Sequence, residues 1–169
     1  DAAPDLRQLA TADSLRESLP KPIVVLASSR DGEERMLLDV LKRFGAAVPV
    51  PPAQAAISSI AKRVHEVQWM IVPRHPQRFD EVAALIESQG FGVARRSSAS
   101  APADSEIWLG DSLGEMALYY GLASVALLGG SFEPLGGQNL IEAAACGCPI
   151  VMGPSTFNFA EAADLALSA

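Results

Sequence analysis

Short apolar runs rich in β-branched residues alternate with amphipathic stretches along most of this chain. One such run, PIVVLASS at 22–29, precedes a stretch at 31–44 whose apolar residues recur at helical spacing. A second pair stands at 67–73 and 77–90, and Gly90 is placed to end the second helix. Repeated strand-then-helix units predict a parallel sheet with helices on both faces. We therefore expect an α/β fold with a Rossmann-like sheet.

Four more strands and two more helices complete the expected sheet. The strands are expected at 91–96, 106–110, 124–130 and 149–153, and the helices at 112–123 and 140–147. The segments 46–59 and 97–105 are rich in Pro, Ala and Ser, which favours surface excursions. The length of 169 residues fits a single domain over 1–169. Because the chain opens without Met and ends without a clear closing element, we expect a fragment of a larger protein.

The composition favours a packed core and disfavours a nucleic-acid-binding protein. Hydrophobic residues make up 49% of the chain and charged residues 20%, which excludes disorder. The net charge of −7 leaves no excess of Lys and Arg for a polyphosphate surface. Basic residues nonetheless cluster at Arg74 and Arg78, and again at Arg95 and Arg96. A local basic patch on an acidic protein favours a small anionic ligand.

The two cysteines indicate neither a disulfide nor a metal site. Cys146 and Cys148 are separated by one residue, which is poor geometry for a bond between them. Two thiols are also too few for structural zinc, and we expect no metal and no cofactor. A reducing, cytoplasmic compartment follows as the expectation. No apolar run approaches the roughly 20 residues that cross a bilayer.

The strand-to-helix junctions are where an open parallel sheet binds ligands. Four of them share a cap-like spacing, namely Asp31 with Glu34, Ser112 with Glu115, Asn139 with Glu142, and Asn158 with Glu161. Each pair fits a helix N-cap whose third helical residue bonds back to the cap. Helix capping alone is therefore a sufficient explanation for each glutamate.

Capping does not explain the glycines in GGSFEPLGGQN. Gly136 and Gly137, with Ser131 before them, favour a backbone that presents N–H groups to an anion at the helix that begins near Leu140. Glu142, one turn inside, is suited to accept two hydrogen bonds from the vicinal hydroxyls of a ribose. The glycines match neither the G-x-G-x-x-G pattern nor the P-loop, which disfavours a dinucleotide dehydrogenase or an NTPase.

The motif VPRHPQRF at 72–79 is the second candidate cluster. Its prolines hold Arg74 in extended or turn backbone at a strand end, where a guanidinium can pair with a phosphate. We interpret Arg78 as a surface residue with a solvated head, and His75 as a turn residue because no nucleophile motif accompanies it. In LGDSLGEM, Gly114 and Glu115 open a helix directly after a strand, which is a third ligand-edge candidate.

Four motifs in this order, ASSRDGEE, VPRHPQRF, LGDSLGEM and GGSFEPLGGQNLIEAAACGCPIVMGPSTFNF, resemble the carboxyl-terminal half of the 3-deoxy-D-manno-octulosonic acid (Kdo) transferases. The resemblance covers about 22–161 and implies the second domain of a GT-B glycosyltransferase, which binds the donor CMP-Kdo. By motif, it places CMP contacts at Pro73, Arg74, Leu113, Gly114, Glu115, Asn139, Leu140, Ile141 and Glu142, with Ser131, Gly136 and Gly137 as secondary candidates. Gln138 stands where the family usually has His, and 46–59 is an addition.

The resemblance also implies what this chain does not contain. The general base and the membrane-associating surface of the family lie in the amino-terminal half, so we expect no catalytic residue here. The implied reaction is an inverting displacement of CMP by a hydroxyl of the lipid A precursor, lipid IVA, at the cytoplasmic face of the bacterial inner membrane. Partners other than the donor would then act through that other half.

Two further functions remain open at this point. One is another GT-B glycosyltransferase, or a sugar-nucleotide 2-epimerase, that uses a UDP-sugar. The other is a non-catalytic interaction module that has kept the fold and lost the ligand. Nucleotide preference distinguishes the first, and absence of nucleotide binding by a folded sample distinguishes the second.

Overall fold

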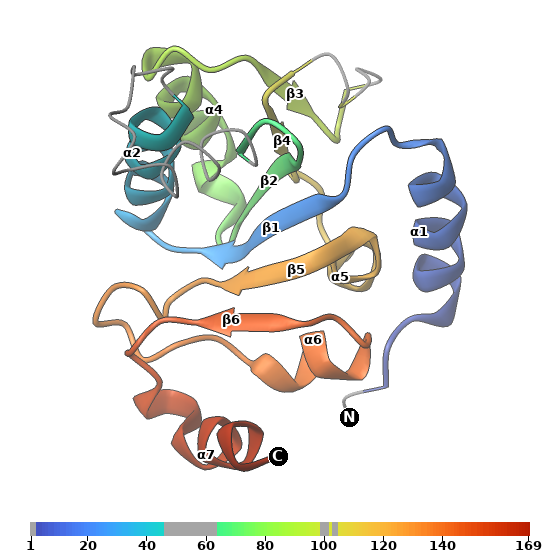
Figure 1. Cartoon of the computed structure of the whole chain (residues 1–169), viewed down its shortest axis with the longest axis vertical. Coiled ribbons are helices and arrows are strands. Elements are labelled where there is room, and N and C mark those ends of the chain that lie inside the picture. The colour runs from blue at the N-terminus through green and yellow to red at the C-terminus, as the bar shows by residue number, and fades with distance from the viewer. Residues whose placement is uncertain (1–2, 46–63, 99–101, 103–104) are drawn as a thin grey trace, which may run out of the picture.

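The computed structural model describes residues 3–45, 64–98, 102 and 105–169. Six parallel strands form one sheet in the order β3-β4-β2-β1-β5-β6 (Figure 1). They are β1 (Ile23–Ser29), β2 (Gln68–Pro73), β3 (Val93–Arg95), β4 (Ile107–Leu109), β5 (Ala123–Leu128) and β6 (Ile150–Met152). All six strands lie within the ranges expected from the sequence, apart from a one-residue difference at the start of β5.

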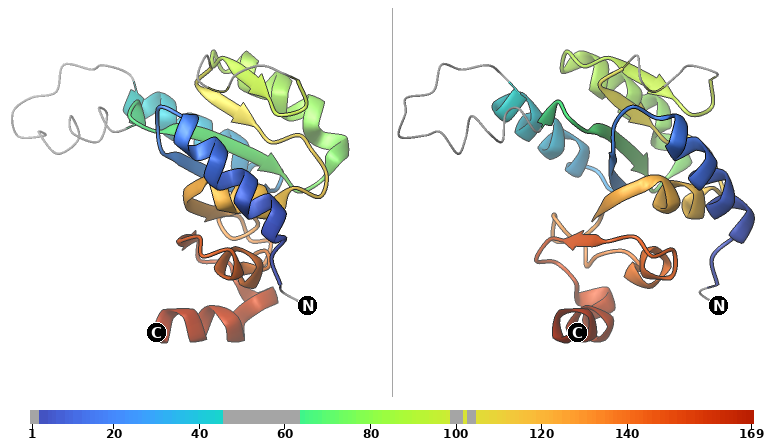
Figure 2. Two further views of the ribbon diagram at one scale, coloured as in Figure 1. Left: turned by 90° about the vertical axis from the view of Figure 1, so that its right-hand side faces the viewer. Right: turned by 45° about the vertical axis from the view of Figure 1, so that its right-hand side comes forward.

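Helices cover both faces of this sheet (Figures 1 and 2). On one face lie α1 (Leu6–Ser18), α5 (Met116–Leu122) and α6 (Leu140–Ala145), and on the other α2 (Glu33–Gly45) and α4 (Phe79–Ser88). One more helix, α7 (Ala160–Ser168), packs beside α6 and β6. Short 3-10 helices span Pro76–Arg78 and Phe157–Phe159. The expected Rossmann-like sheet with helices on both faces is confirmed.

Helix α1 was not predicted from the sequence. It is mostly polar, and Ala12 is its one fully buried residue, so it carries little of the apolar periodicity that marks the other helices. Its position depends on close packing against α5, where Gly121 faces it. A Cβ atom on Gly121 would lie 2.7 Å from the Cβ of Ala12 and 3.0 Å from Leu9 Cδ2. A side chain at 121 is therefore incompatible with the observed contact.

The remaining expectations concern the excursions and the membrane. The segment 46–59 lies outside the described residues, as does part of 97–105. Within the described part of the chain, no helix has the length and apolar character that a bilayer crossing requires.

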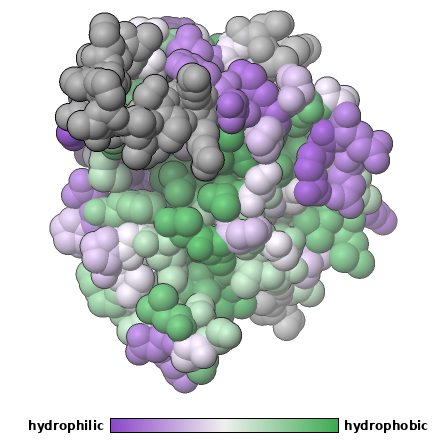
Figure 3. Space-filling view, viewed as in Figure 1, coloured by the Kyte–Doolittle hydropathy of each residue, from purple (hydrophilic) through white to green (hydrophobic). Residues whose placement is uncertain are grey.

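Figure 3 shows hydrophobic residues across the middle of one face, over β5 and β6 and toward α7. Phe157, Leu165 and Leu167 are large apolar residues near the carboxyl end that are 67%, 65% and 81% exposed.

We expect Gly121→Val to destabilise the fold by roughly 1–3 kcal/mol, because the added carbons overlap Ala12 and Leu9 across the contact between α1 and α5. Urea unfolding measures the change. Ala84→Val is the matched control, since it adds a β-branched residue to an exposed position of α4. Equal unfolding free energies for the two variants would show that α1 does not pack as described.

Candidate functional site

The three predicted contact loops lie along the carboxyl edge of the sheet. Pro73 is the last residue of β2 and is buried, whereas the Arg74 that follows it is exposed. The loop Leu113–Glu115 lies between β4 and α5. Asn139 is the N-cap of α6, and Glu142 lies exposed in the first turn of that helix. Parallel strands bring these separate segments to one side of the molecule.

Two of the three loops meet in one pocket of about 660 Å³. Gly114 lines it from the first loop, and Asn139, Ile141 and Glu142 line it from α6. Its other wall is formed by the beginning of α1, which contributes Pro4, Asp5 and Gln8. These α1 residues were missed by the sequence analysis. The spacing of Asp5 and Gln8 is itself a capping pattern, which was the available signal for a helix here.

Arg74 does not line this pocket, but its charge acts on Tyr120, as does the charge of the pocket residue Glu142. Burial raises the pKa of Tyr120 far above its ordinary value, the Glu142 carboxylate raises it further, and the Arg74 guanidinium acts in the opposite direction. Both charges therefore act on the same buried phenol of α5. Among the described residues, Arg74 has no carboxylate within ion-pair distance, and its head group is free to pair with an external anion.

The other three arginines of the predicted basic patches are neutralised within the protein. Arg78 donates to Glu34 at 2.9 Å with its side chain only 13% exposed, so its interpretation as a solvated surface residue is wrong. Arg95 pairs with Asp111 at 2.7 Å, and Arg96 pairs with Glu115 at 3.1 Å. Of the four arginines in the predicted basic patches, Arg74 alone lacks an ion-pair partner among the described residues. It is therefore the one that can bind an external anion.

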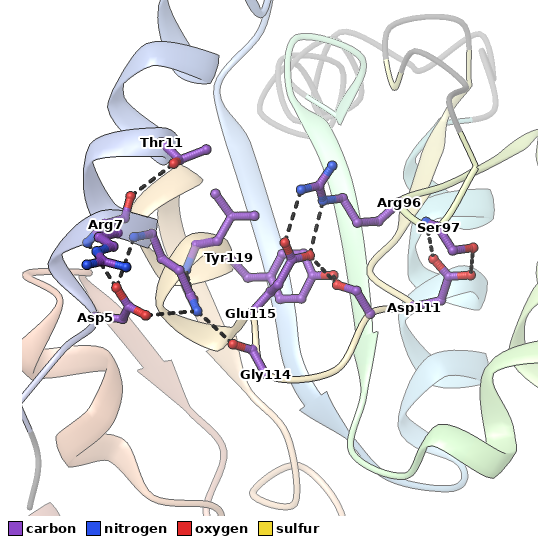
Figure 4. A network of polar contacts seen from close by, with 12 residues as sticks. Asp5, Arg7, Thr11, Arg96, Ser97, Asp111, Gly114, Glu115 and Tyr119 are labelled. Carbon is purple, nitrogen blue, oxygen red and sulfur yellow. Dashed lines mark hydrogen bonds and ion pairs between the residues drawn. The ribbon is translucent and has the colours of Figure 1, made fainter.

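The loop after β4 is held by a polar network (Figure 4). Arg96 binds Glu115 with two nitrogens, Nε at 3.2 Å and Nη2 at 3.1 Å. Ser112 donates to Glu115 and also contacts the hydroxyl of Tyr119. The Glu115 carboxylate is thereby bound within the protein, and Glu115 is not among the described residues that line the pocket. The expected cap of α5 by Ser112 is wrong, because Glu115 itself occupies the N-cap position without a side-chain cap bond.

One of the four expected N-caps is confirmed. Asn139 Oδ1 accepts from Ile141 N at 3.0 Å, although Glu142 makes no return bond to it. Glu34 bonds to Ser29 and Arg78 instead of Asp31. Asn158 lies inside a 3-10 helix, and its side chain donates to the Leu135 carbonyl. The cap-like spacing therefore identified one helix start and missed the tertiary partners of the other residues.

The glycine-rich loop does not present free N–H groups as expected. The amide of Gly136 donates to Ser155 Oγ at 2.9 Å, and that of Gly137 donates to the Gly130 carbonyl at 2.7 Å. Ser131 is fully buried, with its Oγ accepting from Gly153 N at 2.9 Å. Both Gly136 and Gly137 have φ above +80°, which explains the glycines by backbone conformation. These amides are thus already satisfied by the protein.

Glu33, the first residue of α2, places its carboxylate between the segments that follow β1 and β5. Its carboxylate is fully buried and accepts from Gly130 N at 2.9 Å, Arg30 N at 2.8 Å and Phe132 N at 3.2 Å. The loops after β1 and β5 touch beside it, since a Cβ on Gly129 would lie 2.3 Å from the Ser28 carbonyl oxygen. The crevice between these two strands is therefore filled by the protein's own carboxylate.

The described residues hold no group of three or more His, Cys, Asp or Glu side chains that suits a metal ion. Both cysteines are free, as their spacing predicted. Burial raises the pKa of the Cys148 thiol to about 11 and raises that of Cys146 as well. Both thiols are consequently protonated near neutral pH and are poor nucleophiles.

We expect Glu33→Gln to lower the free energy of unfolding by about 2 kcal/mol, because an amide has one acceptor oxygen for three N–H donors. Chemical denaturation measures it, with Asp39→Asn on the exposed side of the same helix as control. Unchanged stability in Glu33→Gln would contradict the role given to this carboxylate.

The Asp111 carboxyl predicts an acid-dependent component of stability. Burial acts to raise its pKa, but hydrogen bonds from Ser97 and Arg95 outweigh burial and hold it below the ordinary 3.8. Its contribution is therefore fully present above about pH 4 and is lost as pH falls through the lower folded-state pKa.

Asp111→Asn should accordingly cost roughly 1–3 kcal/mol at neutral pH, with a smaller difference from the parent protein below about pH 3. Unfolding curves across this pH range test it, and the exposed Asp164→Asn serves as the control. A difference that stays constant with pH would exclude the ionised carboxylate as its cause.

Comparison with known proteins identifies relatives along the entire chain, although no family model matches it. A 3-deoxy-D-manno-octulosonic acid transferase of Bordetella pertussis is 41% identical over 174 residues, which cover 100% of this chain and 37% of that protein. One of Haemophilus influenzae is 35% identical over 156 residues, covering 90% of this chain and 33% of the relative. The chain thus spans about a third of the length of these curated relatives.

A solved structure shares both fold and sequence with the chain. The C-terminal CMP-Kdo binding domain of WaaA from Acinetobacter baumannii superposes with a TM-score of 0.81 and 28% identity. The match covers 97% of this chain and 79% of that domain. The chain is therefore a homologue, along its entire length, of the 3-deoxy-D-manno-octulosonic acid transferases.

Proposed function

We propose that this chain is the donor-binding domain of a Kdo transferase and binds the CMP part of CMP-Kdo. The observation that carries the proposal is the pocket that joins Gly114 to Asn139, Ile141 and Glu142. It lies on a fold shared with a CMP-Kdo binding domain and is lined by residues that the family motifs indicate. The chain would form one nucleotide-sugar-binding unit over 1–169, the second half of a GT-B enzyme.

The charges of the site favour one orientation of the nucleotide. Glu142 and Asn139 offer hydrogen-bond acceptors to neutral hydroxyl groups, which suits the ribose. None of the described residues that line this pocket is Lys or Arg, and Asp5 adds a second carboxylate, so a phosphate would be disfavoured there. Arg74 is outside the pocket lining, and its guanidinium has no ion-pair partner among the described residues. We therefore place the ribose against Glu142 and the phosphate toward Arg74.

This orientation defines the chemical contribution of the domain. In an inverting displacement, a base deprotonates the acceptor hydroxyl, the hydroxyl oxygen attacks the anomeric carbon of Kdo, and the bond to the CMP phosphate oxygen breaks. Arg74 would stabilise the charge that develops on the departing phosphate. The base belongs in our proposal to the other half of the protein, so this chain alone would bind donor without transferring Kdo.

The acceptor and the location are proposals by homology. We propose the lipid A precursor lipid IVA as the acceptor, and the cytoplasmic face of the bacterial inner membrane as the place of reaction. Membrane association and acceptor binding would be functions of the other half. A UDP-sugar enzyme of the same fold remains the alternative that nucleotide preference tests.

We expect the chain to bind CMP more tightly than UMP or GMP in calorimetric titrations. Arg74→Gln and Glu142→Gln should each weaken CMP binding about tenfold, because each removes a charged partner of the ligand. Arg35→Gln, an exposed arginine on α2, is the matched control and should leave affinity unchanged. The thermal midpoint of each variant checks that it is folded.

Preference for UMP would favour the UDP-sugar alternative. A folded chain that binds none of the three nucleotides would contradict donor binding by this domain alone. The same titration on the full-length protein would then decide between a site completed by the other half and a non-catalytic module.

A further inference from the structure

A glutamine from α1 bridges two backbone groups at the entrance of α5. The side-chain nitrogen of Gln8 donates to the Gly114 carbonyl at 2.7 Å, and its side-chain oxygen accepts from Leu118 N at 3.1 Å. In a regular α-helix, the N–H of Leu118 would pair with the carbonyl four residues before it, which is that of Gly114. The side-chain amide of Gln8 thus bonds to both groups, the Leu118 N–H and the Gly114 carbonyl, in place of a direct hydrogen bond between them.

This insertion completes a helix start that lacks a local cap. Leu118 is the third residue of α5, where a helix has N–H groups without intrahelical partners. Glu115 occupies the N-cap position but makes no side-chain cap bond, because its carboxylate is bound by Arg96 and Ser112. The cap therefore comes from a residue more than a hundred positions earlier in the chain.

Gln8 is itself held in place by α1. Asp5 caps that helix by accepting from Arg7 N at 2.9 Å and Gln8 N at 3.3 Å, and its second oxygen accepts from Gln8 Nε2 at 3.4 Å. One turn further along, Ala12 packs against Gly121 of α5. Both ends of the contact are fixed, so the amide plane of Gln8 has a defined orientation.

We infer that Gln8 is a positioning residue of the nucleotide site, acting through the carbonyl of Gly114. Gly114 lies in the predicted donor loop and has φ of +72°. Apart from its chain neighbours, no described residue has an atom within 4 Å of the place where a Cβ would stand. Such a residue has little to restrain it except its hydrogen bonds. Gln8 holds the loop from the α1 side through the Gly114 carbonyl. Arg96 holds Glu115 from the β3 side (Figure 4).

The consequence for binding is preorganisation. A loop that already has its bound conformation loses less conformational freedom when a ligand arrives, so its affinity is higher. The inference rests on the proposed function, because it assigns Gln8 a role in nucleotide affinity. It also makes a statement about the ligand-free chain, namely that Gln8 protects the Leu118 amide and fixes Gly114.

Two substitutions separate the two bonds of Gln8. Gln8→Glu keeps an acceptor for Leu118 N but has no N–H for the Gly114 carbonyl, whereas Gln8→Met removes both bonds. Thr11→Val, on the same helix and outside the pocket, is the control. The double variant Asp5→Asn with Gln8→Glu removes the repulsion between two carboxylates, and serves if Gln8→Glu alone loosens α1. CMP titration and amide hydrogen exchange of the ligand-free chain are the two readouts.

We expect both Gln8 variants to bind CMP about fivefold more weakly or worse, and Thr11→Val to bind as the parent does. The Leu118 amide should stay protected in Gln8→Glu and exchange faster in Gln8→Met. Loss of CMP affinity with the cap intact would show a role beyond helix stability. Parent-like CMP affinity in a folded Gln8→Glu variant would overturn the inference, as would unchanged Leu118 exchange in Gln8→Met.

Failure of the proposed function gives a different result from failure of this inference. If the parent chain binds no CMP, donor binding by this chain is contradicted whatever Gln8 does. The exchange rates in the ligand-free variants would still decide whether Gln8 holds the loop.

Discussion

The buried carboxylate of Glu33 joins the two loops between which the sheet changes its winding direction. In a doubly wound sheet this crevice is the usual place for a ligand. Here the carboxylate accepts hydrogen bonds from three backbone N–H groups of the loops after β1 and β5. These N–H groups therefore have a partner within the protein and are not available to a ligand. The pocket lies elsewhere, between the start of α1, the start of α5 and helix α6.

The fold was predictable because it depends on local patterns. Apolar runs of β-branched residues and helical spacing are properties of neighbouring residues, and each strand was found within one residue of its expected range. Parallel strands then place all their carboxyl ends at one edge, without further information. Gly114, Asn139 and Glu142 could for this reason be assigned to one region before their contacts were known, and the pocket brings them together.

The partners of the charged and polar residues were not predictable in the same way. Arg78 and Arg74 lie four residues apart in one motif, yet Arg78 pairs with a glutamate 44 positions earlier while Arg74 stays unpaired among the described residues. Such pairs are set by packing between elements that are distant in the chain. The same holds for Gln8, whose partner Gly114 is 106 positions away. A weakly amphipathic helix such as α1 likewise depends on tertiary contacts for its stability.

The two restraints on the loop before α5 differ in their physical character. Arg96 and Glu115 form a partly exposed ion pair, with side chains 33% and 28% accessible. Salt screens an interaction of this kind. The Gln8 bonds to Gly114 and Leu118 are between neutral groups, which salt affects much less. If each restraint contributes to the loop conformation, rising ionic strength removes the β3-side contribution first. The conformation of the loop then depends increasingly on the docking of α1.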